Sequence, residues 1–332
     1  MEKEGYFLYE AGNLGGNDQG DLKLVLNLLF FFSYLFSHDI ICYIEWSGMM
    51  KLLVEYSSKE HINYDTDGII LALEDYSVES IISFSLKEIS DIRKKFDGEI
   101  FVKINKNLMN DDIEPISEIL KKLDCIGITG IFFYDLAILQ LKRELNLSID
   151  LVWNQTHMVH NYRTCDYYYE HGVKYALLGK EITLDEIIEI IDKSKITSMV
   201  EVISKPSVGF SKRRLLTNYY HAIDGEYQNK LTVSEKVTDS KYTFLEDNNG
   251  TSIFLDTITN GTGIIHDLYQ NGCSYIIFRE YGIDSFLELV SDTKKYILGG
   301  CCDDNYIEKY KKLGNSTNFF FKKTIYKVKK NG

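Results

Sequence analysis

The chain has 332 residues, of which 45% are apolar and 13% aromatic. This supplies a sizeable buried core and excludes a disordered or fibrous protein. The 37 basic and 49 acidic residues leave a net charge of -12, which disfavours broad binding to a phosphate backbone and restricts any contact with nucleic acid to a local basic patch.

Residues 1–49 are expected to be accessory to the main domain. The apolar run from Leu24 to Phe36 is shorter than the about 20 residues that a membrane span needs. A secretory signal would carry basic residues before such a run, whereas acidic residues precede this one. Neither a membrane contact nor secretion is therefore expected. Two interpretations stay open: a helix packed on the domain, or a segment upstream of the natural start, because Met49 and Met50 stand directly before the first predicted strand.

From Met50 onward, short apolar runs alternate with amphipathic helical stretches, an order typical of parallel strands joined by helical crossovers. Two helices open with capping boxes, at Ser85–Glu88 and Thr183–Glu186. The eight predicted strands are Lys51–Glu55, Gly68–Leu73, Glu99–Asn105, Gly130–Tyr134, Ile149–Trp153, Lys174–Gly179, Ser198–Ile203 and Tyr275–Arg279. Eight strands over roughly 250 residues are typical of an α/β fold of the (β/α)8 TIM-barrel type, whereas an open doubly wound sheet usually has fewer strands. The sequence thus predicts a barrel over residues 50–296.

An insertion and a tail depart from this alternation. Residues 205–252 are polar and irregular and precede the last strand, and long loops of this kind build the active-site face of barrels. Residues 297–332 are expected to form a C-terminal tail rich in β structure. The reason is that Asn318–Lys330 alternates apolar and basic residues, as a solvated edge strand does.

The usual catalytic signatures are absent. The sequence has no Gly-x-Ser-x-Gly elbow, no His-Glu-x-x-His pair and no Gly-x-x-x-x-Gly-Lys phosphate loop. His157 and His160 lack a further ligand at metal spacing, so we interpret them as core or rim histidines and predict no metal site. The six cysteines hold no Cys-x-x-Cys pair, which favours a reduced, cytoplasmic setting without a disulfide framework or an iron–sulfur cluster.

Polar residues recur where the predicted strands end. In barrels these carboxyl ends surround one opening, and enzymes of this fold place their chemistry there. We therefore predict a polar pocket with both charge signs, suited to a small anionic or amide-bearing ligand held for acid–base chemistry. The candidates for catalysis are Asp135, Glu181 and Arg279, and those for ligand binding are Asn105, Asn154, Asn161, Lys180, Glu201, Ser211, Arg213, Arg214 and Asp256.

A cationic cluster stands in the insertion, where residues 211–214 precede aromatic residues 219–220. Arginine can fork onto carboxylate or phosphate, and an aromatic ring can stack on a base. Two interpretations stay open: an RNA platform or lid over the barrel mouth, and a basic helix end that neutralises acidic neighbours. On the first, Arg213→Ala and Arg279→Ala should abolish activity at little cost in stability, whereas Ile188→Ala should lower stability.

Six blocks of the sequence resemble the collagenase-like peptidase family U32 over about residues 51–282. The blocks begin at Asp67, Phe84, Lys103, Tyr134, Asn154 and Gly179, and they follow the family's Ala-Asp-Ala-Val, Asn-Phe-Ser-x-Glu-Glu-Leu, Thr-Leu-Asn, Asp-Leu-Gly-Val-Leu, Ser-Thr-Gln and Ala-Arg-Glu-Leu-Ser segments in order. Four stretches are similar to a short bacterial branch of the family implicated in tRNA wobble-uridine hydroxylation: Trp153–Asn154, Asn161–Tyr167, Ser211–Arg213 and Leu245–Thr251.

The resemblance implies a distorted barrel and a role in forming 5-hydroxyuridine in tRNA, with prephenate as an implied source and a second U32 protein as partner. The chain departs from the family pattern at Ser207 and Arg214, which occupy the expected positions of two signature cysteines. A four-cysteine iron–sulfur cluster is therefore not expected, and no cofactor is predicted. Because no nucleophile–base pair can be named, a peptidase and a non-catalytic scaffold of a paired complex stay open as alternatives.

Overall fold

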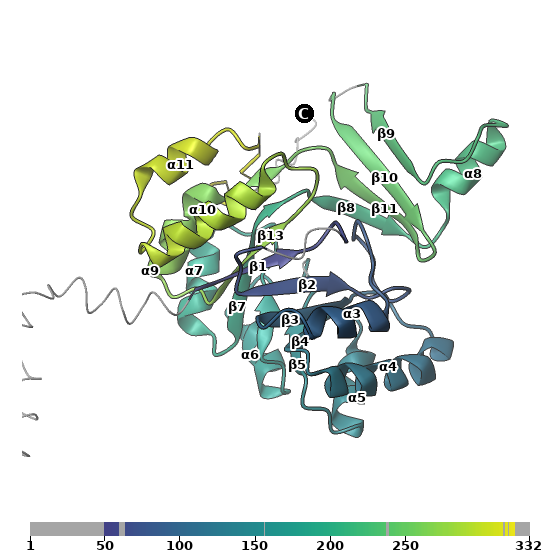
Figure 1. The fold of residues 1–332 in the computed structure, drawn as a ribbon, viewed down its shortest axis with the longest axis horizontal. Coiled ribbons are helices and arrows are strands. Elements are labelled where there is room, and N and C mark those ends of the chain that lie inside the picture. The colour runs from purple at the N-terminus through teal and green to yellow at the C-terminus, as the bar shows by residue number, and fades with distance from the viewer. Residues whose placement is uncertain are drawn as a thin grey trace, which may run out of the picture. The chain divides into compact units, whose positions relative to one another are not determined.

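Eight parallel strands close into a barrel in the computed structural model, which describes residues 50–59, 64–155, 157–236, 239–314, 316–317 and 319–322 (Figure 1). The barrel strands are β1 (Lys51–Glu55), β2 (Gly68–Ala72), β3 (Glu99–Ile104), β4 (Gly130–Phe133), β5 (Asp150–Trp153), β6 (Tyr175–Leu177), β7 (Thr197–Ser204) and β13 (Tyr275–Arg279). Strands β1 to β7 pair in chain order, and β13 lies between β7 and β1, so each strand has two parallel neighbours. The predicted TIM-type barrel and all eight of its strands are confirmed.

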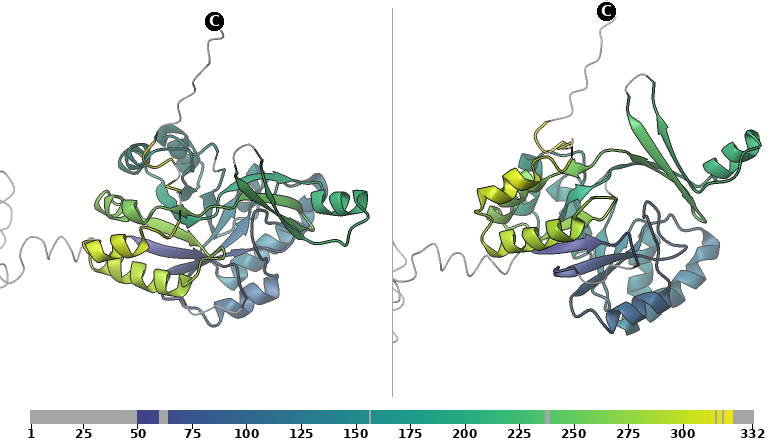
Figure 2. Two further views of the ribbon diagram at one scale, coloured as in Figure 1. Left: turned by 90° about the horizontal axis from the view of Figure 1, so that it is seen from above. Right: turned by 45° about the horizontal axis from the view of Figure 1, so that its top comes forward.

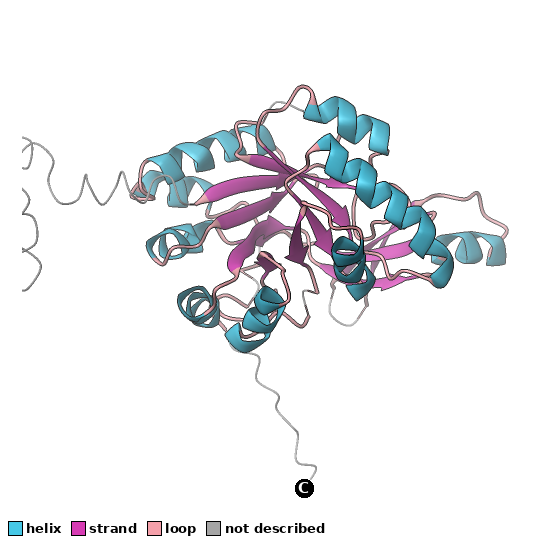
Figure 3. Ribbon diagram, turned by 90° about the horizontal axis from the view of Figure 1, so that it is seen from below, coloured by secondary structure: helices cyan, strands magenta, loops and turns pink. Residues whose placement is uncertain are grey.

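Helices surround the barrel on its outer side (Figure 3). They are α3 (Leu86–Arg93), α4 (Ile113–Ile126), α5 (Leu136–Glu144), α6 (Tyr162–Glu170), α7 (Leu184–Lys193), α9 (Ile265–Gln270) and α10 (Phe286–Leu298). Both predicted capping boxes are present, at the starts of α3 and α7. The connection from β1 to β2 carries no helix in its described residues, 56–59 and 64–67, which distorts the usual alternation. On α7, Ile187 is buried whereas Ile188 is partly exposed, so we expect Ile187→Ala to lower stability more than Ile188→Ala.

The core fills the amino-terminal part of the barrel with inward-facing aromatic and aliphatic side chains. Its members are Leu53, Ile70, Phe101, Phe132, Val152, Tyr175, Leu177, Met199, Tyr275 and Ile277. The Phe101 ring lies at the centre and meets Phe132, Tyr175 and Tyr275 edge to face, with ring centroids 5.7 to 6.2 Å apart. This packing closes one end of the barrel, so a ligand can enter only from the end where the strands finish.

The insertion before the last barrel strand forms a small antiparallel sheet rather than an irregular loop. Its elements are β8 (Ser207–Ser211), α8 (Leu215–Ala222), β9 (Lys230–Ser234), β10 (Lys241–Asp247) and β11 (Gly250–Leu255), with the strand order β8-β11-β10-β9. A short strand, β12 (Thr259–Asn260), then pairs with β7. Much of β9 is exposed, so its sequence lacks the apolar alternation that predicts a strand, and pairing with β10 stabilises it. Figure 2 shows α8 and the β9–β10 hairpin standing away from the barrel.

The described part of the C-terminal tail contains one helix and one isolated bridge, and most of the segment that was expected to form a strand, residues 318–330, lies outside the described residues. Helix α11 (Asp304–Tyr310) follows α10, and one isolated bridge joins Ser316 to Thr259. Of the predicted strand 318–330, residues 319–322 are described and include a turn. The expectations for residues 1–49 lie outside the described residues. Among the helices that the structure describes, none is long and apolar enough to cross a membrane.

Candidate functional site at the barrel mouth

Four strands carry a charged residue just beyond the core. Successive side chains of a strand point to opposite faces, so a residue two positions after a core residue also points inward. This places Glu55 of β1, Lys103 of β3, Glu201 of β7 and Arg279 of β13 inside the barrel, because each follows a core residue by two positions. The core residues that precede them are Leu53, Phe101, Met199 and Ile277.

These residues and Lys180 form a chain of ion pairs with alternating signs. Lys103 Nζ lies 2.6 Å from Glu55 Oε1, and Arg279 Nε lies 3.0 Å from Glu55 Oε2. Arg279 Nε also lies 2.6 Å from Glu201 Oε2, and Lys180 Nζ lies 2.7 Å from Glu201 Oε1. Lys103, Glu55 and Glu201 are almost fully buried, and Arg279 is 13% exposed. These five side chains together carry three positive and two negative charges, so the cluster of ion pairs has a positive formal charge.

Neighbouring cations keep both carboxylates ionised. Burial raises the pKa of Glu201, but the attraction of Arg279 and then of Lys180 outweighs it and lowers the pKa to about 2. Burial likewise raises the pKa of Glu55, and Arg279 and Lys103 together lower it below its ordinary value. For Lys103 burial is the larger effect, and it lowers the pKa of this ammonium despite the nearby Glu55. A buried charge is costly unless it is paired, so the five groups depend on one another.

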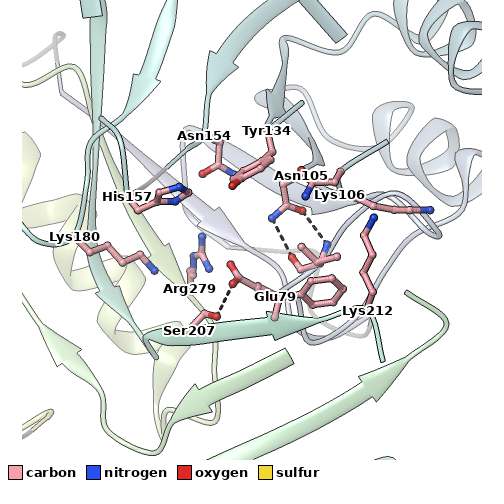
Figure 4. A pocket seen from close by; sticks show the side chains of 13 residues that line it. Glu79, Asn105, Lys106, Tyr134, Asn154, His157, Lys180, Ser207, Lys212 and Arg279 are labelled. Atoms are coloured by element: carbon pink, nitrogen blue, oxygen red, sulfur yellow. Dashed lines mark hydrogen bonds between the residues drawn. The ribbon is translucent and has the colours of Figure 1, made fainter. Parts of the chain in front are cut away.

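A cavity of about 330 Å³ opens above the ion pairs at the carboxyl end of the strands (Figure 4). It is lined by Val78, Glu79, Asn105, Lys106, Asn107, Tyr134, Asn154, His157, Lys180, Ser207, Phe210, Lys212 and Arg279. Four of these side chains are cationic and one is a carboxylate, which favours an anionic ligand. Arg279 makes its ion pairs through Nε, and Figure 4 shows the end of its guanidinium directed at the cavity. The terminal nitrogens of this group can therefore fork onto a ligand carboxylate.

One wall of the cavity is held by both the barrel and the insertion. Asn105 Nδ2 donates to the Val78 carbonyl at 3.1 Å, and its Oδ1 accepts from Val78 N at 2.9 Å. Ser207 Oγ donates to Glu79 Oε1 at 2.7 Å, and Glu79 N donates to Ser252 Oγ at 3.1 Å. Glu79 has a φ of 56°, in the left-handed region that non-glycine residues rarely adopt. These bonds fix a strained turn, and they place the Glu79 carboxylate beside the cavity.

The structure brings some of the predicted site residues together. Asn105, Asn154, Lys180 and Arg279 line the same cavity although they come from four different strand ends. Glu201 lies directly beneath, where it pairs with Lys180 and Arg279.

Two predicted residues have structural roles away from the cavity. Asp135 begins α5, where its side chain accepts from Ala137 N and Leu108 N, each at 2.9 Å. Asn161 begins α6, where its Oδ1 accepts from Thr164 N at 2.9 Å. Both are N-cap residues, a position for which Asp and Asn are strongly preferred because their side chains accept from the free backbone amides of the first turn. Neither lies among the residues that line the cavity.

The remaining predicted residues also lie outside the cavity lining. Glu181 and Arg213 are exposed, and Ser211 Oγ accepts from Arg213 N at 3.1 Å. Arg214 Nε lies 3.6 Å from Glu246 Oε1, and Asp256 is exposed and pairs with Lys205. These positions therefore do not contribute to the cavity, although Lys212, next to Arg213, does.

Sequence reasoning missed Glu55, Lys103 and Glu79. Glu55 closes the first strand, and the same strand-end argument could have identified it. Lys103 is a single charge inside the apolar run Phe101–Ile104, which is a sign of a paired ion within a barrel. Glu79 lies in a loop, and no local pattern marks it. His157, interpreted as a core or rim residue, lies at the rim of the cavity.

The described residues do not fit a metal cluster. No group of three or more His, Cys, Asp or Glu side chains in the described part of the chain could hold a metal ion. At the expected cysteine positions, the Ser207 hydroxyl donates to Glu79 and Arg214 lies beside Glu246. Burial raises the pKa of the thiols of Cys165 and Cys273 to about 12, so neither is a ready thiolate ligand.

The chain is similar to proteins of known family. The family model described as "Peptidase family U32" matches residues 56–277. The tRNA hydroxylation protein P2 of Bacillus subtilis (strain 168) is 26% identical over 76% of this chain and 89% of that protein. The tRNA hydroxylation protein P1 of the same organism is 22% identical over 49% of this chain and 40% of that protein.

Solved structures with a similar fold include a U32 peptidase, with a TM-score of 0.45 and 10% identity over 70% of this chain and 94% of that chain. Orotidine 5'-monophosphate decarboxylase from Methanocaldococcus jannaschii gives a TM-score of 0.43 and 13% identity over 75% of this chain and 99% of that chain. The family model covers most of the barrel, from the end of β1 into β13, and includes most of the residues that form the cavity. The chain therefore belongs to peptidase family U32.

Proposed function

We propose that this protein takes part in the hydroxylation of wobble uridine in tRNA, together with a second protein of family U32. The similarity to the P2 protein extends over most of both chains, and the partial similarity to the P1 protein supports a paired arrangement. In this proposal the barrel cavity binds a small carboxylate, and prephenate is the candidate that the family resemblance suggests.

The observation that carries the proposal is the Arg279 guanidinium, which is held between two buried carboxylates and directed into a mainly cationic cavity (Figure 4). Burying Glu55, Lys103 and Glu201 is costly for a protein that offers only a surface, and clusters of buried, mutually perturbed charges are typical of functional sites. A volume of about 330 Å³ suits a small molecule or a single nucleotide but not a folded RNA or protein. Lys180 and Lys212 supply further positive charge for a second carboxylate of the ligand.

Proteolysis has less support in this cavity. A peptidase needs a nucleophile that a base activates. The Ser207 hydroxyl donates to Glu79, but a carboxylate is a weak base toward a serine hydroxyl, and the same bond joins the insertion to the cavity wall. We therefore assign Ser207 a positioning role.

Mass spectrometry of bulk tRNA tests the function. Deleting the gene should remove 5-hydroxyuridine and nucleosides derived from it, and the wild-type gene should restore them. Arg279→Lys should not restore them, because lysine keeps the charge but cannot fork onto a carboxylate. Lys122→Ala, an exposed change on α4, is the matched control and should restore them fully. Unchanged tRNA in the deletion strain would refute the function, and full restoration by Arg279→Lys would favour the scaffold alternative.

A further inference from the structure

Helix α8 is anchored firmly to the small sheet by one buried carboxylate. Glu246 on β10 accepts from Leu216 N at 2.7 Å, from Thr217 N at 3.2 Å and from Thr251 Oγ1 at 3.1 Å. It also accepts from the Thr217 hydroxyl and from Tyr227 Oη. Burial raises the pKa of Glu246, but the bonds from Thr217 and its neighbours outweigh it and lower the pKa. The helix therefore presents its outer residues in fixed positions, although it stands away from the barrel (Figure 2).

The outer side of α8 and the following loop expose aromatic rings. Tyr219 is 47% exposed and Tyr227 is 46% exposed. Tyr220 lies between them, with ring centroids 5.3 Å from Tyr219 and 6.3 Å from Tyr227. Exposed tyrosine rings held in place are stacking surfaces for unpaired bases.

The segment that leads into and forms α8 is locally basic in an acidic chain, whereas Asp224 and Glu226 follow it in the loop before Tyr227. Residues 202–223 contain four Lys or Arg residues and no Asp or Glu, whereas the whole chain has a net charge of -12. Lys212 and Arg213 are exposed and form no ion pair with other described residues. Lys212 lines the barrel cavity, and Arg214, two residues later, lines a second opening beside α8. Cationic side chains thus connect the two openings.

The second opening is a groove with polar walls. Its lining includes Arg214, Tyr227, Gln228, Asn229, Lys230 and Asn248. The side-chain amides of Gln228, Asn229 and Asn248 can both donate and accept hydrogen bonds, as is needed to recognise the edges of bases. Two carboxylates also line the groove, but both are engaged: Glu246 holds α8, and Asp247 Oδ1 accepts from Asn249 N and Gly250 N. The groove therefore combines stacking, amide and cationic groups.

We propose that this groove, together with Tyr219, Lys212 and Arg213 beside it, forms one surface that binds unpaired nucleotides of the tRNA loop that flank the nucleotide presented to the barrel cavity. This inference rests on the proposed function and assigns the surface that recognises the RNA. Stacking on Tyr219 and Tyr227 requires splayed bases, which favours a single-stranded loop over a duplex. Lys212 and Arg213 contact phosphates, and they lie between the groove and the cavity along the path that the strand must follow.

Fluorescence anisotropy with a labelled anticodon stem-loop RNA that carries a wobble uridine tests the surface. The full chain is measured together with its paired U32 protein at several salt concentrations. Tyr219→Ala should weaken binding by about 5- to 150-fold, the range for losing one stacked base, while Tyr219→Phe keeps the ring and should bind nearly as wild type. Lys212→Ala should weaken binding and reduce the slope of log affinity against log salt by about 0.7. Lys122→Ala should bind like the wild type.

Each outcome separates this inference from the proposed function. If tRNA hydroxylation depends on the gene but Tyr219→Ala and Lys212→Ala bind RNA as the wild type does, or if no form binds RNA, the groove assignment is wrong and the function stands. If RNA binding changes as expected while tRNA hydroxylation is independent of the gene, the function is wrong and the RNA surface stands. If sedimentation shows that Tyr219→Ala instead separates the paired proteins, the groove binds protein and the RNA assignment is overturned.

Discussion

Replacing Glu201 by glutamine should lower the free energy of unfolding by about 3 kcal/mol at neutral pH. Glutamine has the shape of a protonated glutamate, so the substitution mimics neutralising this group. Burial raises the pKa of Glu201, but Arg279 and Lys180 lower it from 4.5 to about 2, and each pH unit corresponds to about 1.4 kcal/mol. The ionised form is therefore favoured in the folded protein by about 3 kcal/mol relative to the unfolded chain.

The contribution of Glu201 to the free energy of unfolding should depend on pH. Because the folded pKa is depressed, the contribution of Glu201 is present above the unfolded value of 4.5 and is lost as the pH falls toward 2. The difference in stability between the wild type and Glu201→Gln should therefore shrink to about half between pH 7 and pH 3. At neutral pH the melting temperature should fall by about 5–10 °C.

Urea unfolding at pH 7 and pH 3 measures both quantities. The matched control is Glu189→Gln on α7, which removes an exposed carboxylate 2.7 Å from Lys193 and should cost less than about 0.5 kcal/mol. The reasoning is refuted if Glu201→Gln is as stable as the control at pH 7, or if its deficit is the same at both pH values. Either result would mean that the ion pairs do not stabilise the charged form of Glu201.

Further predictions address other parts of the structure. Arg279→Ala should abolish tRNA hydroxylation in the complementation assay. It should also cost about 3–5 kcal/mol in urea unfolding, contrary to the small cost expected from sequence, because it leaves two buried carboxylates with fewer partners. Asp135→Ala should lower stability by about 1 kcal/mol through loss of the α5 cap, with unchanged nucleoside profiles; loss of hydroxylation in a stable variant would restore Asp135 as a catalytic candidate. Ile187→Ala should cost about 3 kcal/mol and Ile188→Ala clearly less, and the reverse order in urea unfolding would contradict the observed packing of α7. Protein purified without oxygen should be colourless and free of stoichiometric iron by elemental analysis, because Ser207 and Arg214 stand where cysteine ligands of a cluster are expected. Several iron atoms per chain would contradict this prediction.

Local patterns in the sequence were enough to predict the barrel and the starts of α3 and α7. Apolar runs of strand length and the Ser85–Glu88 and Thr183–Glu186 boxes are local signals, because strand alternation and capping depend on neighbours a few residues away. In a barrel the carboxyl ends of all strands surround one opening, whatever their distance in sequence, and this predicted that Asn105 and Arg279 lie together.

Which polar side chains enter the cavity depends on contacts between elements that are distant in sequence. Asp135 and Asn105 both follow a strand, but the Asp135 side chain accepts from a backbone amide at the start of α5 whereas Asn105 bonds to the cavity wall. A sequence pattern does not show which of the available hydrogen-bond partners such a side chain takes. Lys103 and Glu55 are 48 residues apart and meet because β3 and β1 contribute to the same barrel interior. The small sheet of residues 207–255 also escaped sequence reasoning, because much of β9 is exposed and needs no apolar alternation, and because β8 pairs with β11, about 40 residues later, across the insertion.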